Sequence, residues 1–315
     1  MKSAIRKLVK IGKRSYAVVI PKKWVKLLEI KPSDPIYMVL GEDRSVVMTP
    51  LRVSGVEEAR LGMFPHLTIS STNARALTKL ILALYSASLQ GVVIDSVLPR
   101  ESLLLPTELA SIEWTDVNTV IHFKDIRAGP KEVLEDMARK VQEVFSLFTK
   151  GLEVPSPELW GEIHKIEQEL DVSVHLVMRL TIRKIVVDVL KKGLDSETLV
   201  ESLLNILAAK VFEDLSDCID RSAHRIEELL PLSKDFARLF ASIKDLSSEI
   251  FECYLYKCPT DDAFELLERT TELRKELKGA MSISTPPLLP LLAEVDTIVT
   301  LLEDLLEAAL VKIYK

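Results

Sequence analysis

Residues 6–24 read RKLVKIGKRSYAVVIPKKW and set the character of the first fifty residues. Two β-leaning runs stand on either side of a turn signal that begins at Gly12. Pro21 then suits the first turn of a short helix. A second pair of β-leaning runs surrounds Gly41, as in a hairpin. The expected elements are strands over 5–11 and 16–20, a helix over 22–28, and strands over 36–40 and 45–50.

The charge of this head is opposite to that of the rest of the chain. Residues 1–50 hold eleven Lys or Arg against four Asp or Glu, a net of +7. The remainder holds 30 basic and 43 acidic residues, a net of −13, which together give the overall −6. A basic head on an acidic body is expected when the head meets a polyanion.

Length and composition predict a multidomain protein of 315 residues, 48% of them hydrophobic. Fifty residues bury too little surface to be stable alone, so we expect two heads to form a homodimer. No apolar run is long enough for a transmembrane helix. Three cysteines, without a signal peptide, predict ordinary thiols in the cytoplasm.

The middle of the chain, residues 51–128, is predicted to form a small α/β linker domain with a β-α-β-α-β order. It has no glycine-rich phosphate loop at a strand-to-helix junction, so its expected role is structural. The expected strands are His66–Ser70, Val92–Ser96 and Thr119–Lys124, and the expected helices are Asn73–Gln90 and Glu101–Ala110.

From residue 129 to residue 315 the apolar pattern has helical period. Short links between long helices predict antiparallel neighbours in a bundle. Six helices suggest two three-helix units. The expected helices are 130–150, 156–193, 195–230, 231–257, 260–281 and 286–315. The fold class is therefore mainly α with a small β head.

Over residues 4–50 the head resembles the AbrB/SpoVT swapped-hairpin family. Gly12, Ile20-Pro21-Lys22, Trp24 and Asp34 match that family's pattern, although Pro32-Ser33 stands where the family has a glycine. The resemblance implies dimeric binding to double-stranded DNA, and the same fold occurs in antitoxins that act through toxin partners. The expected DNA-binding residues are Arg6, Lys7, Lys10, Lys13, Arg14, Lys22 and Lys23.

Acidic stripes mark two of the expected body helices. His164, Glu167, Asp171 and His175 follow one another at spacings of three and four, and so share one side of a helix. Glu213 and Asp217 are four residues apart on the next helix and lie roughly opposite its apolar stripe. Position alone favours a solvated acidic face. Carboxylates from both helices, if they met, would suit a transition metal.

The body resembles the PhoU family, in which an E/D-x-x-x-D helix motif can bind metal clusters and the protein regulates phosphate uptake. Glu213 and Asp217 match that motif, and Asp296 begins a second copy in which Thr300 replaces the second acid. The resemblance implies iron or zinc at the first motif and puts a second metal cluster in doubt. The expected metal ligands are Glu167, Asp171, Glu213 and Asp217.

Head, middle and body in this order resemble the archaeal phosphate uptake regulators. The leading expectation is a dimeric DNA-binding transcriptional regulator of phosphate uptake with a sensing body. The alternative is an adaptor that does not bind DNA and restrains a phosphate transporter component through protein contacts. No nucleophile elbow, P-loop or catalytic triad is readable from the spacing, so an enzyme is not expected.

Overall fold

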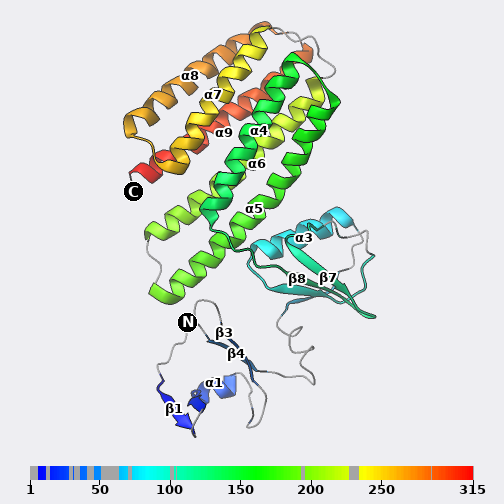
Figure 1. The fold of residues 1–315 in the computed structure, drawn as a ribbon, viewed down its shortest axis with the longest axis vertical. Helices are drawn as coiled ribbons and strands as arrows, with labels where there is room; N and C mark the ends of the chain where they lie inside the picture. The colour runs from blue at the N-terminus through cyan, green and yellow to red at the C-terminus, as the bar shows by residue number, and fades with distance from the viewer. Residues whose placement is uncertain are drawn as a thin grey trace.

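The computed structural model is mainly helical with a small β head (Figure 1). The head lies at one end of the molecule, the helical body at the other, and a small α/β unit beside the body. The structure describes residues 6–11, 15–27, 31, 36–40, 46–50, 64–69, 73–99, 103, 105–192, 196–226, 234–284 and 286–314.

The head contains the two predicted hairpins. Strands β1 (Leu8–Ile11) and β2 (Ser15–Val18) pair antiparallel, and so do β3 (Ile36–Leu40) and β4 (Val46–Pro50). The short helix α1 (Lys22–Leu27) lies between them and begins directly after Pro21. Each hairpin is a separate two-stranded sheet. The observed strands and helix confirm the predicted elements of the head.

The α/β unit is a four-stranded sheet with the order β5-β6-β8-β7, and helix α3 (Ala74–Ser86) packs beside it. Asn73 caps α3 by accepting a hydrogen bond from the backbone N–H of Ala76. Strand β5 is parallel to β6, and β8 is antiparallel to both of its neighbours. The strands are β5 (His66–Leu67), β6 (Gly91–Ile94), β7 (Ala110–Trp114) and β8 (Thr119–Phe123).

One prediction for this unit is wrong. The helix expected over Glu101–Ala110 is absent from the described part of that stretch, and Ala110 instead begins β7. Along β7 half-buried and exposed residues alternate, because one face of the strand covers the core while the other meets solvent. The turn between Thr115 and Asn118 then pairs β7 with β8.

All six predicted helices of the body are present among the described residues. Helices α4, α5 and α6 contact one another, as do α7, α8 and α9, and the two groups meet where α4 lies on α7 and α6 on α9. One continuous apolar core runs through both groups. The bounds are α4 (Pro130–Glu153), α5 (Pro157–Lys192), α6 (Ser196–Ile226), α7 (Lys234–Tyr256), α8 (Thr260–Ile283) and α9 (Leu289–Ile313), with the 3-10 turn η2 (Pro286–Leu288) before α9.

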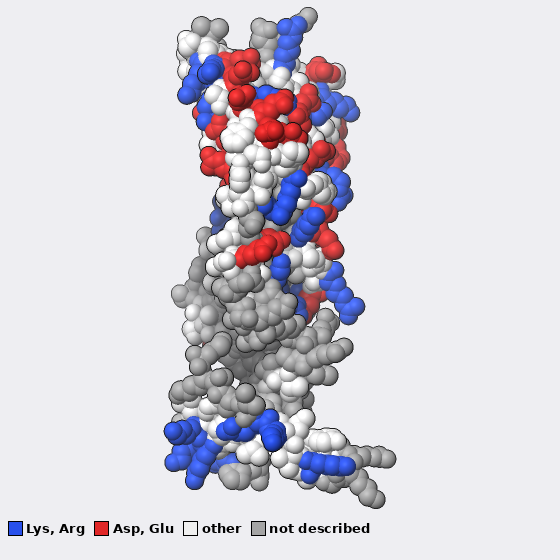
Figure 2. Space-filling view, turned by 90° about the vertical axis from the view of Figure 1, so that its left-hand side faces the viewer, with Lys and Arg blue, Asp and Glu red and all other residues white. Residues whose placement is uncertain are grey.

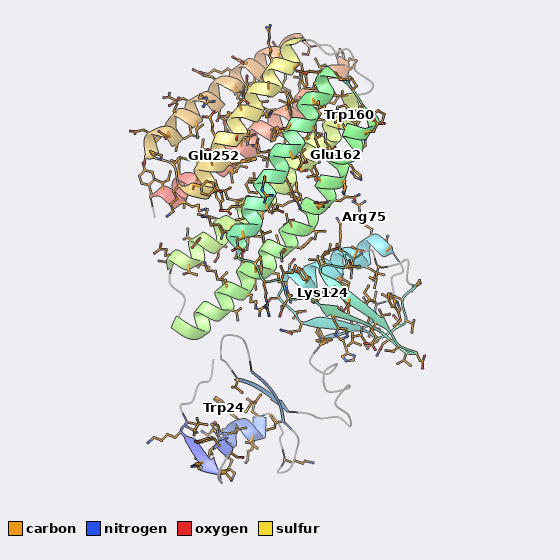
Figure 3. The ribbon with its side chains drawn as sticks, in the orientation of Figure 1. Trp24, Arg75, Lys124, Trp160, Glu162 and Glu252 are labelled. Carbon is orange, nitrogen blue, oxygen red and sulfur yellow. A yellow bond between two sulfur atoms is a disulfide. The ribbon has the colours of Figure 1, made fainter. Side chains whose placement is uncertain are left out.

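Aromatic side chains fill the junction between the two helix groups. Phe148 of α4 lies 4.4 Å, centroid to centroid, from Phe240 of α7 and 6.1 Å from Trp160 of α5. Trp160 is labelled in Figure 3. The indole of Trp160 covers Gly151 so closely that a side chain at that position would collide with it. Large buried rings therefore pack the two helix groups against each other.

The prediction of ordinary thiols is wrong for two of the three cysteines. Cys253, near the end of α7, forms a disulfide with Cys258. Lys257 between them has a φ of 58°, which reverses the chain before α8 and brings the two cysteines together. Cys218 is a buried free thiol on α6. None of the described helices has the length and apolar character that crossing a bilayer requires.

Candidate functional site

The head presents a dense set of exposed cations. Figure 2 shows its Lys and Arg side chains gathered at the end of the molecule. Lys10 lies on β1 opposite Tyr16 of β2, and Lys22 and Lys23 form the first turn of α1. The predicted DNA-binding residues that the structure describes are all exposed: Arg6, Lys7, Lys10, Lys22 and Lys23. The predicted turn residues Lys13 and Arg14 lie outside the described residues.

Apolar side chains of the head are exposed as well. Leu8 is 68% exposed and Ile11 59%, although they point to opposite faces of β1. Tyr16 and Val18 of β2 are likewise exposed. None of the residues 6–11, 15–27, 31, 36, 46 and 48 is buried. A hairpin that exposes apolar residues on both faces needs another surface to cover them.

The second set of functional groups is a carboxylate cluster between α5 and α6. Carboxylate oxygens of Glu167 and Asp171, from α5, and of Asp217, from α6, all lie within 4.8 Å of one another. The same holds for Glu213, Asp214 and Asp217 on α6. Asp217 belongs to both groups, so the four predicted metal ligands are brought together in one cluster.

The solvated face expected for the α6 acids is wrong for Glu213, whereas the Asp217 side chain is 31% exposed. The Glu213 side chain is only 15% exposed, because α6 packs against α4 and α9 as well as α5 and has little open surface left. Lys210 pairs with Glu213 and with Asp214, the latter at 2.9 Å. Sequence reasoning missed Lys210, Asp214 and Asp220, although each lies three or four residues from a predicted acid.

Burial and mutual repulsion hold protons on this cluster. Burial, followed by the charges of Asp171 and Asp217, raises the pKa of Glu167 to about 8. Burial raises the pKa of Glu213 to about 7, against the opposing effect of Lys210. The pKa of Asp171 is raised for the same reasons, burial first and then Asp217. A divalent cation would relieve this repulsion by replacing the protons.

The second acidic position is neutralised from within the protein. Arg274 of α8 donates a hydrogen bond to Thr300 at 2.8 Å and forms ion pairs with Asp296 and Glu303. The guanidinium therefore lies where a second metal cluster would need its ligands. This geometry agrees with the doubt that Thr300 raised about such a cluster.

A row of polar side chains on α5 runs from the carboxylate cluster to the α/β unit. Glu167, Asp171, His175, Arg179 and Arg183 follow one another every four residues along one side of it. His175 is hydrogen bonded to Ser86 of α3 at 2.8 Å. Arg183 pairs with Asp125, 2.9 Å away, beyond the end of β8.

Arg179 is the buried member of this row, with 4% of its side chain exposed. Its guanidinium donates hydrogen bonds to the carbonyls of Tyr85 at 2.9 Å and Leu89 at 2.7 Å. Its third partner, Asp125, lies 3.4 Å away. The α/β unit is thus fastened to the helix that supplies two of the clustered carboxylates.

The chain thus combines a basic β head with a helical body that carries a clustered set of half-buried acids. The family model described as "Antidote-toxin recognition MazE, bacterial antitoxin" matches residues 9–55 of the chain. The match covers the head and confirms an AbrB- or MazE-like N-terminal domain. No curated protein and no solved structure matches the chain.

Proposed function

We propose that the chain is a cytoplasmic, non-enzymatic transcriptional regulator that binds double-stranded DNA as a homodimer. The observation that carries this proposal is the head, where a match to an antitoxin-type domain coincides with the net charge of +7. Exposed lysines on β1 and α1 suit contacts to phosphate oxygens, which position a protein on DNA without reading its sequence.

Dimerisation through the head follows from its exposed apolar residues. Both faces of β1 and β2 are uncovered in the single chain, and each hairpin has only two strands. A second head can supply the missing strands and bury Leu8, Ile11 and Tyr16. The basic surfaces of the two copies then act together on one duplex.

The body is proposed to sense an effector at the carboxylate cluster. Glu167, Asp171, Glu213 and Asp217 offer hard oxygen donors to a divalent ion, iron or zinc being the expected metals. The ion would take the place of the protons that these acids otherwise hold near neutral pH. Metal occupancy would therefore change the charge and the packing between α5 and α6.

The row along α5 gives such a change a physical path to the α/β unit. Asp171 lies one turn from His175 and two turns from Arg179, and both of these bond to α3 or the segment after it. Lys79 of α3 also contributes to the electrostatics of Asp171. Regulation would arise if metal binding favours one arrangement of α5 against α3, because an effector acts only through differential affinity for two states.

The link to phosphate uptake rests on the resemblance of the body to the PhoU family, through the α6 motif, and on the order of head, middle and body. The competing proposal, an adaptor that restrains a phosphate transporter component, uses the same body but needs no DNA. The matched antitoxin family favours a related possibility, that the head binds a partner protein. DNA binding by the head separates these proposals from the leading one.

The test is fluorescence anisotropy of labelled duplex DNA with the intact protein and two charge variants. Lys22→Glu/Lys23→Glu reverses two exposed charges of α1, and Lys131→Glu/Arg139→Glu makes the same change in charge on exposed positions of α4. We expect the head variant to lose at least tenfold in affinity and the body variant to stay within a factor of about two.

Equal affinity of the two variants would contradict the proposal, since it would mean that the head does not hold the duplex. Absence of binding at low salt would favour the adaptor. Circular dichroism of each variant checks that the fold is retained.

A further inference from the structure

Two histidines and one aspartate converge on the α5–α6 surface next to the carboxylate cluster. His164 belongs to α5, and Asp220 and His224 belong to α6, one turn apart. His164 Nδ1 lies 3.3 Å from Asp220 Oδ2, and His224 Nε2 lies 3.9 Å from the same oxygen. One donor atom from each residue lies within 4.8 Å of the others.

Asp220 has an unused oxygen in this arrangement. Its side chain is 14% exposed, and among the described residues its Oδ1 is fully buried without a hydrogen-bond partner. A buried carboxylate oxygen without a partner is costly, and an ion that Asp220 binds through both of its oxygens would satisfy it. This is an observation independent of the convergence of the three side chains.

We propose that His164, Asp220 and His224 form a binding site for a first-row transition-metal ion, with Zn²⁺ or Fe²⁺ as the chemical class. Two imidazoles and one carboxylate are more specific for one class of metal than acids alone, because imidazole nitrogen selects transition metals over Mg²⁺ and Ca²⁺. Three protein ligands leave a coordination position for water or another oxygen donor.

The distances suit such an ion after small side-chain movements. Metal–ligand bonds of about 2.0–2.2 Å place neighbouring donor atoms roughly 3.0–3.5 Å apart. His164 and Asp220 already meet that spacing, and His224 is 67% exposed, so its ring can turn to close the remaining gap. The rings of the two histidines are 6.2 Å apart, centroid to centroid.

Two further contacts support the site from outside. Gln168 Nε2 lies 2.9 Å from Nε2 of His164. When Nδ1 binds the ion, Nε2 carries the proton, and the Gln168 amide would turn over so that its oxygen accepts from Nε2–H and holds the ring. Glu167 Oε2 lies 3.6 Å from Nδ1 of His164 and also belongs to the carboxylate cluster. Glu167 thus stands between the nitrogen-containing site and the all-oxygen site.

The proposal is independent of DNA binding and is tested on the intact, metal-free protein with Zn²⁺ and Cu²⁺ as probes. Isothermal titration with Zn²⁺ measures affinity, and electron paramagnetic resonance with substoichiometric Cu²⁺ detects nitrogen ligands. The variant His164→Gln/His224→Gln removes both nitrogens. The matched control Asp171→Asn/Glu213→Gln disturbs the oxygen cluster and leaves the three proposed ligands in place.

We expect Cu²⁺ bound to the wild type and to the control to show coupling to two nitrogens, and the histidine variant to lose it. Affinity for Zn²⁺ should fall at least tenfold in the histidine variant. Nitrogen coupling that persists in that variant would overturn the proposal by assigning the ion to another of the five histidines. Absence of Zn²⁺ binding by a folded wild type would overturn it as well.

Discussion

The guanidinium of Arg179, on α5, lies over the ring of Tyr85, on α3, at 4.6 Å from its centroid, and also donates a hydrogen bond to the Tyr85 carbonyl. One side chain of the body therefore satisfies the C-terminal end of α3, which belongs to the α/β unit. Lys124, labelled in Figure 3, lies in the same unit and bonds to the carbonyl of Thr107. The contact between Arg179 and Tyr85 joins two parts of the chain that have separate apolar cores.

Replacement of Arg179 should loosen the α/β unit. Arg179→Met leaves the carbonyls of Tyr85 and Leu89 without their donor, at an expected loss of about 2–4 kcal/mol in unfolding free energy. Arg179→Lys should lose less, because an ammonium still donates but lacks the planar fork.

Hydrogen exchange of the α3 amides measures this loosening directly. The control Arg139→Met removes an arginine that is 76% exposed, and it should change the free energy by under about 0.5 kcal/mol. Unchanged protection of α3 in Arg179→Met would show that other contacts hold the unit in place.

The stability of the metal-free protein should fall as the pH rises. The pKa of Glu167, about 8 in the fold, lies above its ordinary value of 4.5. The contribution of Glu167 to the free energy of unfolding is thus fully present below pH 4.5 and is lost as the pH rises through 8. The loss should be on the order of 2–4 kcal/mol for this half-buried group.

Urea unfolding at pH 6 and pH 9 measures the effect. Glu167→Gln should flatten the dependence, because a neutral amide has no proton to lose. Glu162→Gln makes the same change at an exposed position of α5, labelled in Figure 3, and should leave the dependence as in the wild type. An equal change in unfolding free energy between pH 6 and pH 9 in Glu167→Gln and wild type would contradict the assignment of the pH dependence to Glu167.

Metal binding at the carboxylate cluster should release protons near neutral pH. Glu167 and Glu213, with pKa values of about 8 and about 7, must ionise to coordinate a cation. Titration calorimetry at pH 7 in buffers of different ionisation enthalpy should give a release of roughly one proton per ion. Glu167→Gln should reduce that number, and no dependence on buffer would argue against binding at these acids.

A charge on the uncovered face of the head should prevent dimerisation. Val9 on β1 is 47% exposed in the single chain, and Val9→Asp would place a carboxylate where the second head is expected. Light scattering after gel filtration should show a dimer for wild type and a monomer for Val9→Asp. Val117→Asp makes the same change at a turn of the α/β unit where the residue is 73% exposed; it is the control and should remain dimeric.

Sequence predicted the helical body well because its elements are long and clearly punctuated. Helix α8 was expected to begin at residue 260 after Pro259, and it begins at Thr260. Helix α5 was expected over 156–193 and spans Pro157–Lys192. Apolar residues at helical spacing fix such elements locally, with little need for knowledge of their neighbours.

Strand β7 was missed although Ala110–Trp114 alternates apolar and polar residues, the pattern of a half-buried strand. Five residues are a short signal, and the pairing with β8 completes the strand. The disulfide of Cys253 depends on the reversal of the chain at Lys257.

The candidate site was predicted in part. Spacing along α5 identified Glu167 and Asp171 as neighbours, but it could not show that Asp217 of α6 would meet them, because the two helices could pack at several rotations. Arg179 was not singled out, since a buried arginine is recognised only once its carbonyl partners are in place.

The central claim, that the head binds DNA through phosphate contacts, is tested most directly by the dependence of affinity on salt. About six contacts from a pair of heads should give a slope of log K against log salt concentration of roughly −5. Anisotropy of the intact protein with duplex DNA over a series of salt concentrations measures this slope. A slope near −5 would support the DNA-binding regulator, and a slope near zero, or no complex at low salt, would contradict it.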